Sequence, residues 1–212
     1  MIKYMFDDYS ASQAQPLRCS WANGTPQMQV YHDTQWGFPV SDDQQLFEKI
    51  CLEGFQAGLS WSTILNKRER FREVFANFDF YTLAKYTTND IERLMQDPGI
   101  VRHRGKIVST VNNAKRAIVL VEEAGSLAAF FWQYQNWDVE PSVAATSAES
   151  IALAKELKRR GWTFVGPTTI YAFMQSVGLV NDHIETCYKR KEVWLAQQDF
   201  SLERKWPLLR LQ

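Results

Sequence analysis

Cysteine and histidine occur as two pairs near opposite ends of this 212-residue sequence. Twelve residues separate Cys19 from His32, and three separate His183 from Cys187, a spacing that places both side chains on one face of a helix. Two thiolates and two imidazoles would complete a closed, tetrahedral zinc site, structural rather than catalytic, that joins the N-terminal segment to a C-terminal helix. Because a chain with three cysteines and three histidines also reaches such spacings by chance, ordinary core positions are the alternative.

A single carboxylate, Glu53, lies in the otherwise uncharged run 51–61. An ionised carboxylate is costly to bury unless it meets hydrogen-bond donors or a cation, so a buried Glu53 would indicate a binding or catalytic role. Aromatic residues make up 14% of the chain, which favours a site that stacks flat molecules. Four of these rings lie near Glu53 in the sequence: Trp21, Tyr31, Trp36 and Trp61. A solvated glutamate at a helix end, with the rings in the core, is the alternative interpretation.

Segment 97–107 places Arg102, Arg104 and Lys106 directly after a Pro-Gly turn, at the start of an amphipathic helix. Backbone N–H groups at a helix start, together with arginine and lysine, make a corner that binds phosphate. The whole chain is neutral, but three basic and seven acidic side chains in the first 60 residues leave a net charge of +4 for the rest. We therefore expect a nucleic-acid face in the later part of the chain, with a solvated basic turn as the alternative.

Gly166 and Pro167 separate an expected helix over 147–160 from a second, apolar helix. Glycine allows a tight turn, and proline suits the first position of a helix. A hairpin between two helices leaves backbone N–H groups free to bind a DNA phosphate without reading the base sequence. Many helical loops share this bare pattern, so an ordinary connection is the alternative.

These residues need a framework to position them, and the sequence predicts helices nearly throughout. A capping-box pattern over 41–44 precedes an apolar helical face. A stripe with a 3.6-residue period runs over 61–78, and a second stripe steps by three or four residues from Ile107 to a stop at Gly125. Strand signals are confined to short runs such as 162–165. We predict an all-α, mostly helical fold.

Length and composition exclude several classes of protein. A chain of 212 residues forms one domain, or two small lobes around a shared cleft. With 45% hydrophobic and 23% charged residues it is neither disordered nor a cysteine-rich secreted scaffold. Residues 1–16 lack the apolar core of a secretory signal, and polar residues interrupt the apolar stretch 161–180 too often for a membrane span. We therefore expect a cytoplasmic protein that has no membrane partner.

Five blocks follow one another along the chain: C-S-W at 19–21, Y-H-D-x-x-W-G at 31–37, L-E-G-x-Q-A-G-L-S-W at 52–61, G-I-V-R-H-R-G-K-I at 99–107 and F-V-G-P-T-T-I-Y-A-F-M-Q-S-V-G-L-V-N-D-H at 164–183. Together they closely resemble the 3-methyladenine DNA glycosylase I family, and blocks this long do not recur by chance. The resemblance implies a two-lobed fold of the helix-hairpin-helix DNA glycosylase superfamily. It divides the chain into a glycosylase domain over 18–190, an N-terminal extension over 1–17 and a C-terminal extension over 191–212.

The resemblance implies roles for particular residues. The family's structural zinc would be held by four of them: Cys19, His32, His183 and Cys187. The family's base pocket would place Glu53 as the catalytic carboxylate against the flipped base. Trp61 would be the stacking platform, and Tyr31 and Trp21 would form further walls.

The same resemblance implies contacts with double-stranded DNA. Leu59 would fill the gap that the flipped base leaves in the duplex, and Gly166 with its neighbours would grip a phosphate. Two residues depart from the family pattern, Phe55 beside the pocket motif and Pro167 in the hairpin. Neither departure removes a functional residue, but Phe55 could reshape the edge of the pocket.

The implied reaction is hydrolysis of the N-glycosidic bond of 3-methyladenine in alkylated DNA, which releases free 3-methyladenine and begins base excision repair. Thr168 stands where lyase-type relatives carry a lysine, and Asn181 where the superfamily carries its catalytic aspartate, so we expect a monofunctional enzyme. Separately, we expect the protein to be a monomer. One alternative is a non-catalytic, zinc-stapled protein that binds DNA damage, which loss of Glu53 or Trp61 would favour; both are present. A hydrolase of small nucleosides is another, but it would not need Leu59 or a basic hairpin.

Overall fold

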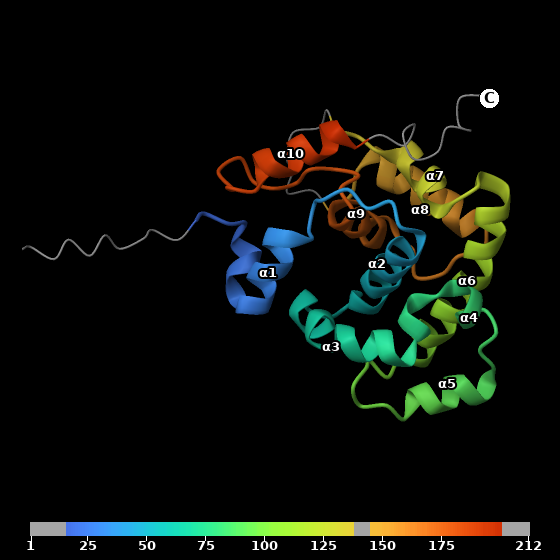
Figure 1. The fold of residues 1–212 in the computed structure, drawn as a ribbon. Coiled ribbons are helices and arrows are strands. Elements are labelled where there is room, and N and C mark those ends of the chain that lie inside the picture. Colours follow the sequence, from blue (N-terminus) through green and yellow to red (C-terminus); the bar gives the residue numbers. More distant parts are fainter. Residues whose placement is uncertain (1–15, 138–144, 201–212) are drawn as a thin grey trace, which may run out of the picture.

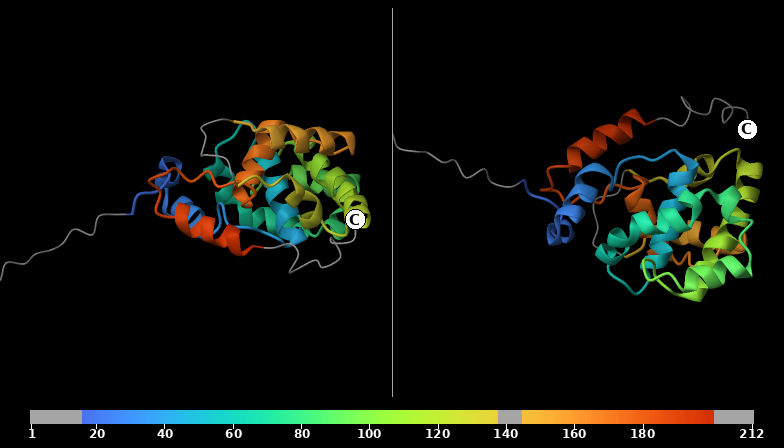
Figure 2. Two further views of the ribbon diagram at one scale, coloured as in Figure 1. Left: turned by 90° about the horizontal axis from the view of Figure 1, so that it is seen from above. Right: turned by 60° about the horizontal axis from the view of Figure 1, so that its bottom comes forward.

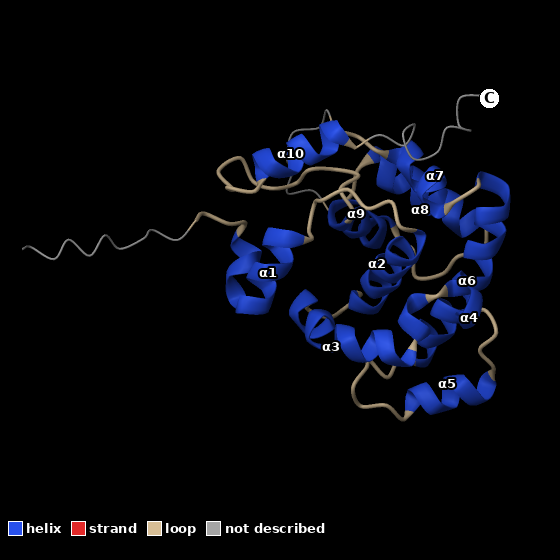
Figure 3. Cartoon of the chain, in the orientation of Figure 1, coloured by secondary structure: helices blue, strands red, loops and turns tan. Residues whose placement is uncertain are grey.

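The computed structural model describes residues 16–137 and 145–200, and within these ranges the protein is helical without a strand (Figure 3). In chain order the elements are η1 (Ser20–Gly24), α1 (Pro26–Thr34), α2 (Asp43–Gln56), α3 (Trp61–Val74), η2 (Ala76–Phe78), α4 (Phe80–Leu83), α5 (Thr88–Met95), α6 (Arg104–Ala124), α7 (Leu127–Phe131), η3 (Trp132–Tyr134), α8 (Ala148–Arg159), α9 (Pro167–Ser176) and α10 (Arg190–Asp199). The all-α prediction is confirmed, and the run 162–165 is a loop rather than a strand.

Helix α2 runs through the middle of the molecule (Figure 1). Most of its residues are buried, because α3, α6, α7 and α9 all pack against it. The helix begins one residue later than the 41–44 capping box predicts: Asp42 is the N-cap, and its carboxylate accepts a hydrogen bond from the backbone N–H of Gln45 at 2.8 Å. A helix surrounded on several sides must be apolar on several sides. Glu53, near the end of α2, is therefore carried into the interior.

The two predicted apolar stripes belong to α3 and α6. Helix α6 stops at Gly125, whose φ of +83° lies in the left-handed region that favours glycine, as the sequence predicts. Helix α3 ends earlier than its stripe, at Val74, and η2 turns the chain there with a φ of 52° at Asn77. Phe78, beyond the turn, is still buried in the core. The stripe thus predicts burial correctly but not the length of the helix.

Two clusters of buried side chains divide the molecule into unequal lobes. The larger cluster is built from the elements between α2 and α9. The smaller one joins Cys19, helix α1 and Cys187, and Trp61 packs against both clusters. In the smaller lobe the first and last parts of the described chain lie side by side (Figures 1 and 2), and the Tyr188 N–H donates to the Leu17 carbonyl at 3.0 Å. The boundary between the lobes is therefore formed by segments far apart in the sequence.

Helix α10 lies almost wholly in the expected C-terminal extension. It packs on the fold through Val193 and Gln197, and the Gln197 amide donates to the Gly178 carbonyl at 2.9 Å. Its outer face leaves Trp194 and Leu195 about half exposed. Residues 1–15 of the expected N-terminal extension and 201–212 of the C-terminal one lie outside the described residues. None of the described helices is both long and apolar enough to cross a lipid bilayer.

Candidate active site and metal centre

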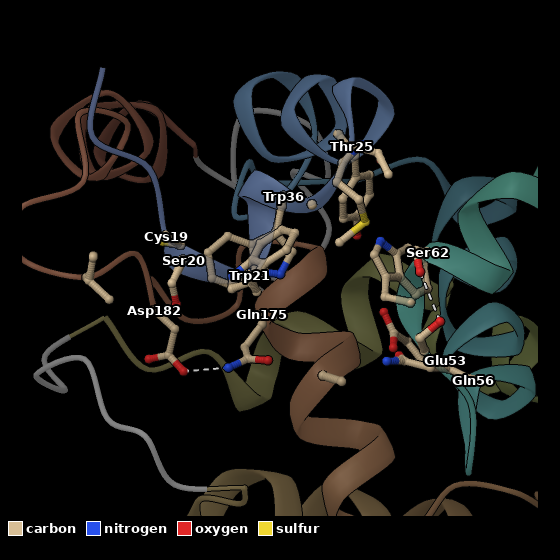
Figure 4. A pocket seen from close by; sticks show the side chains of 17 residues that line it. Cys19, Ser20, Trp21, Thr25, Trp36, Glu53, Gln56, Ser62, Gln175 and Asp182 are labelled. Atoms are coloured by element: carbon tan, nitrogen blue, oxygen red, sulfur yellow. Dashed lines mark hydrogen bonds between the residues drawn. The ribbon is translucent and has the colours of Figure 1, made fainter. Parts of the chain in front are cut away.

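A cavity of about 730 Å³ lies where the two lobes meet (Figure 4). Aromatic rings form much of its wall: Trp21, Tyr31, Trp36 and Trp61. Its main polar side chains are few: Glu53, Gln56, Gln175 and Asp182. Figure 4 shows the two polar groups of α2 on one side of the cavity and the pair formed by Gln175 and Asp182 on the opposite side. A largely apolar cavity with a few convergent polar groups is typical of a site for a small molecule.

The Glu53 carboxylate is 5% exposed, and no hydrogen-bond partner faces it within the described ranges. Burial raises the pKa of Glu53 to about 8, and the Lys49 ammonium one helical turn earlier opposes that rise. The indole Nε1 of Trp61 is also buried without a partner. Both residues line the cavity, so it offers an acceptor and a donor to a ligand that has a hydrogen-bonding edge.

The aromatic rings form a floor and a rim. The ring centroids of Tyr31 and Trp61 are 5.1 Å apart, and Tyr31 is only 3% exposed. Trp21 is 37% exposed and stands with its ring centroid 6.3 Å from that of Tyr31. Burial raises the pKa of Tyr31 well above its usual value, so its hydroxyl stays protonated near neutral pH. Trp36, to which the family resemblance assigns no role, lies edge-on to Trp21 with a centroid distance of 5.0 Å.

The four expected metal ligands converge at one place. Their donor atoms all lie within 4.8 Å of one another, and all four side chains are buried. The Sγ of Cys187 is 3.4 Å from Nε2 of His32 and 3.4 Å from Nδ1 of His183, and the Sγ of Cys19 is 3.6 Å from the same Nδ1. A tetrahedral zinc ion, with bonds of about 2.3 Å to sulfur and about 2.1 Å to nitrogen, separates sulfur from nitrogen by about 3.6 Å. The cluster could therefore hold a tetrahedral metal ion.

Neighbouring groups fix the orientation of both histidines. Nδ1 of His32 is 2.8 Å from the Asp33 carboxylate, which pairs with the Arg18 guanidinium at 2.7 Å. Nε2 of His183 is 3.2 Å from the backbone carbonyl of Trp36. These contacts turn the other ring nitrogen of each histidine toward the cysteines. Histidines that bind metal usually have such a partner on the second nitrogen, so this arrangement supports a metal site independently of the distances.

His183 and Cys187 lie in a loop, and the helix that their spacing predicts is absent there. Residues 181–184 have no regular structure and 185–186 form a turn, closed by the Cys187 N–H donating to the Ile184 carbonyl at 2.9 Å. The turn brings the two ligands together as a helix would. The two side chains therefore point to the same place, as predicted, but a turn rather than a helix brings them there.

The metal cluster and the cavity share their supports. Cys19 lines the cavity itself and precedes Trp21 by two residues, while His32 directly follows Tyr31 on α1. A metal ion at the cluster would therefore hold two of the aromatic walls in place. The arrangement couples the stability of the small lobe to the shape of the cavity.

The expected DNA contacts lie outside the cavity lining. Leu59 is 42% exposed in the loop between α2 and α3. Arg102 is exposed, and Arg104 is exposed while its guanidinium pairs with Glu92 at 2.6 Å. Gly166 caps α9, and a Cβ added there would meet no heavy atom within 4 Å. The backbone at Gly166 is thus open to the close approach of a ligand.

For Lys106 the structure corrects the expectation of a phosphate contact. Lys106 is 6% exposed, and its Nζ donates to the backbone carbonyls of Phe55 at 2.8 Å and Ala57 at 2.6 Å. These carbonyls belong to the end of α2, which leaves carbonyl groups without partners inside the helix. Lys106 therefore fixes the start of the loop that carries Leu59. The sequence predicts a surface position for a lysine near a helix start, but the Lys106 side chain points inward.

We expect Lys106→Met to lower the stability of the protein by about 1–3 kcal/mol, because two buried carbonyls lose their donor. For a chain of this size that is a fall in Tm of roughly 3–10 °C, measurable by calorimetry. Lys115→Met makes the same change at an exposed position of α6 and should leave Tm almost unchanged. Equal Tm values for the two variants would contradict the buried role of Lys106.

A family model described as methyladenine glycosylase matches residues 21–190. The chain belongs to this family. A protein of Escherichia coli named DNA-3-methyladenine glycosylase 1 is 45% identical over 177 residues, which are 80% of this chain and 95% of the relative. DNA-3-methyladenine glycosylase of Haemophilus influenzae is 47% identical over 177 residues, 80% of this chain and 96% of the relative. A solved structure of 3-methyladenine DNA glycosylase I from Staphylococcus aureus, which describes 3-methyladenine recognition, is similar to this fold with a TM-score of 0.78. The two sequences are 34% identical, and the match covers 82% of this chain and 96% of the other. The family resemblance in the sequence is confirmed.

In this methyladenine glycosylase the sequence reasoning missed polar residues of the cavity. Gln56 follows Glu53 by three positions on α2, so the helical period itself could have found it. Asp182 accepts hydrogen bonds at one oxygen from the Tyr171 hydroxyl and the Gln175 amide, both at 2.7 Å. It stands next to an expected metal ligand, which drew the interpretation away from it. Lys49, one turn before Glu53, was also missed, although it lines a neighbouring cleft rather than the cavity.

Proposed function

We propose that this protein is a monofunctional DNA glycosylase that hydrolyses the N-glycosidic bond of 3-methyladenine in alkylated duplex DNA. The observation that carries the proposal is the buried Glu53 carboxylate lining an aromatic cavity in a member of the methyladenine glycosylase family. Two relatives that this chain matches over nearly their whole length are named for that activity. The products are free 3-methyladenine and an abasic site, from which base excision repair proceeds.

The substrate's own chemistry explains what the pocket has to supply. Methylation at N3 puts a positive charge on adenine and weakens its glycosidic bond, so the enzyme mainly selects the damaged base. A damaged base leaves the stack at low cost and can enter a pocket large enough for it. There it stacks on Trp61 and Tyr31, with Trp21 at the rim, and its positive charge is attracted to the ring faces. Glu53 attracts the same charge and accepts a hydrogen bond from the adenine amino group.

The same carboxylate discriminates against guanine. Guanine carries a carbonyl oxygen where adenine carries an amino group. That oxygen would face the Glu53 carboxylate, acceptor against acceptor, and a buried acceptor without a donor is unfavourable. Alkylated guanines are therefore poor substrates under this proposal.

The metal in the cluster of Cys19, His32, His183 and Cys187 is zinc, bound structurally. Four protein ligands with sulfur and nitrogen donors are the usual set for structural zinc, and they leave no open position for water or substrate. Zinc in such a site stabilises the fold and supplies no chemistry to the reaction. The support for this assignment is the buried donor set and the fixed histidines described above.

An apolar side chain and a set of phosphate-binding groups place the enzyme on DNA. The Leu59 side chain fills the space that the flipped base leaves, which its exposure at a loop tip permits. Backbone N–H groups near Gly166, together with Arg102 and Arg104, bind phosphates without reading sequence. The Glu92 partner of Arg104 is itself exposed and can be exchanged for a phosphate.

Replacing Arg102 and Arg104 together with alanine should weaken binding to all duplex sequences about equally. Because each lost phosphate contact removes about 0.9 from the slope of log K against log salt, the slope should fall by up to roughly 1.8. Fluorescence anisotropy at several salt concentrations measures both quantities. Lys191→Ala, an exposed charge on α10, is the control and should change the slope less. A changed preference among sequences without a general loss of affinity would contradict a phosphate role.

The enzyme leaves the abasic strand uncut because the hairpin offers no amine. Thr168 lies in the first turn of α9, where lyase-type relatives carry a lysine, and a hydroxyl cannot form a Schiff base. The amide of Asn181 donates to the Arg190 carbonyl at 3.1 Å, a structural contact in the loop that carries His183 and Cys187. Borohydride should therefore trap no covalent complex between the protein and DNA.

Release of free base from duplex DNA treated with a methylating agent tests the proposal directly. Chromatography should detect 3-methyladenine in amounts that grow with enzyme, and 7-methylguanine at the rate without enzyme. The competing function is a non-catalytic, zinc-stapled protein that binds DNA damage; binding of methylated DNA without release of base would favour it. The proposal further includes a cytoplasmic, monomeric enzyme, and sedimentation with and without DNA checks the monomer.

A further inference from the structure

A second cleft, of about 60 Å³, lies behind the aromatic wall of the cavity and shares Tyr31 and Trp61 with it. Its walls carry four charged side chains: Glu48, Lys49, Arg68 and Arg72. Neither the reaction proposed above nor the metal cluster uses any of them. Lys49 is the one that approaches the base pocket, because its Nζ lies 5.4 Å from the centroid of the Tyr31 ring.

One hydrogen bond holds Lys49 behind that ring. Its Nζ donates to the backbone carbonyl of Ser176 at 3.1 Å, at the last residue of α9. A helix C-terminus carries partial negative charge and favours a cation there. The Ser176 side chain in turn slightly lowers the pKa of the Tyr31 hydroxyl, so the same residue acts on both groups. Lys49 is therefore fixed between α2 and the end of α9, on the far side of the pocket floor.

Lys49 precedes Glu53 by four residues on α2, so the two side chains lie on one face of the helix, one turn apart. No direct ion pair joins them, and the interaction is one of charge across a buried, weakly polarisable space. Burial alone raises the pKa of Glu53, and Lys49 lowers it. In return, burial lowers the pKa of Lys49 and Glu53 raises it. Each group therefore stabilises the charged form of the other.

The other charged groups packed around this pair act on Lys49 rather than on Glu53. Arg68 and Arg72 lower the pKa of Lys49, and Glu48 raises it. From α3, Arg72 forms an ion pair with Glu48 at 2.7 Å, and Arg68 donates to the Gln35 amide oxygen at 2.7 Å. From α1 the titratable group is Tyr31, which stays protonated. From the opposite wall Asp182 is held by donors from α9. Among the described residues, Lys49 is the charged group that acts appreciably on Glu53.

We propose that Lys49 is a positioning residue of the base pocket: its ammonium, held behind Tyr31 by the Ser176 carbonyl and one helical turn from Glu53, favours the ionised form of the Glu53 carboxylate and so strengthens the pocket's preference for a cationic base. The inference rests on the proposed function. The damaged nucleotide is a cation, whereas the released 3-methyladenine is neutral. An ionised carboxylate distinguishes the two, and a protonated one does not. Lys49 thus sets the lowest pH at which the pocket selects substrate over product.

The experiment measures kcat/KM for 3-methyladenine release from methylated duplex DNA between pH 6 and pH 9, for the full chain and its variants. Removing the cation makes Glu53 easier to protonate, so Lys49→Met should move the rise of kcat/KM toward higher pH by about one unit and lower it about tenfold at pH 7. Lys49→Arg retains the charge and should restore most of the parent profile. Lys115→Met, the same change at an exposed site, should leave the profile in place.

A double-variant cycle separates this role from a merely structural one. If Lys49 acts through Glu53, adding Lys49→Met to a Glu53→Gln protein should change single-turnover base release less than twofold. An equal loss in both backgrounds, or a fall in Tm with no movement of the pH profile, would overturn the inference and leave Lys49 as a tie between α2 and α9. A parent protein that releases no 3-methyladenine would instead refute the proposed function, so the two failures are distinguishable.

Discussion

Glu53→Gln is expected to lower kcat/KM for 3-methyladenine release about 100-fold. The amide keeps the shape of the side chain but removes the negative charge that faces the cationic base. Losing a buried interaction with a charged group costs about 2–3 kcal/mol of transition-state stabilisation, which corresponds to that factor. Because the remaining pocket still stacks the base, some release should persist. Glu122→Gln makes the same change at an exposed position of α6 and should keep the parent rate.

The pH dependence of the parent carries a second signature of Glu53. Burial raises the pKa of Glu53 to about 8, so the carboxyl is neutral in much of the free enzyme below that pH. Since the ionised form attracts the substrate, kcat/KM should rise with pH and level off above about pH 8. The glutamine variant has no group to ionise there, so its profile should be flat through this range.

Stability should move in the opposite direction from activity in this variant. The pKa of Glu53 in the folded protein lies above its ordinary value of 4.5, so the folded state binds the proton more tightly than the unfolded state. This favours folding at low pH, and the advantage is lost as pH rises toward the folded value. Glu53→Gln should therefore melt no lower than the parent at pH 8. A parent-like rate in Glu53→Ala, or equal release of 7-methylguanine by the parent, would contradict the assigned role.

The sequence was sufficient for the fold class and for the aromatic residues and the glutamate that line the cavity. The apolar periods of α2 and α6 predict both helices, and Gly125 predicts the end of α6, because a buried face and a cap each leave a local mark. The convergence of the metal ligands followed from the family blocks. Spacing alone left it open, since His183 and Cys187 reach each other through a turn that no helical period predicts.

Residues whose environment depends on tertiary packing could not be predicted. Lys106 follows a basic turn, where a lysine is usually solvated. Its ammonium instead binds the free carbonyls at the end of α2, in the interior. Lys49 stands in an apolar helix with nothing local to show that α9 ends beside it. Asp182 lines the cavity because the loop that carries His183 and Cys187 packs against α9, where Tyr171 and Gln175 donate to its carboxylate. For both lysines the partner is a backbone carbonyl distant in sequence.

Loss of one metal ligand is expected to have the largest effect on stability. Cys187→Ser should abolish the binding of one zinc ion per chain, measured by elemental analysis, and lower Tm by roughly 10 °C or more. Structural zinc binds only the folded chain, so its binding free energy contributes directly to folding. Even a loss of about 4 kcal/mol gives that shift in a chain of this size. A chelator should reproduce the effect in the parent and add nothing in the variant.

Cys51→Ser separates the metal from the general cost of changing a buried cysteine. Cys51 is 5% exposed, like Cys187, but lies in the larger cluster and is not among the converging donors. It should keep the zinc and lose less stability. Because the proposed zinc site would hold Tyr31 and Trp21 through their neighbours His32 and Cys19, Cys187→Ser should also raise KM more than it lowers kcat at a temperature where the variant is folded. Well-folded, active protein without zinc would show that the four ligands form an ordinary hydrogen-bonded core.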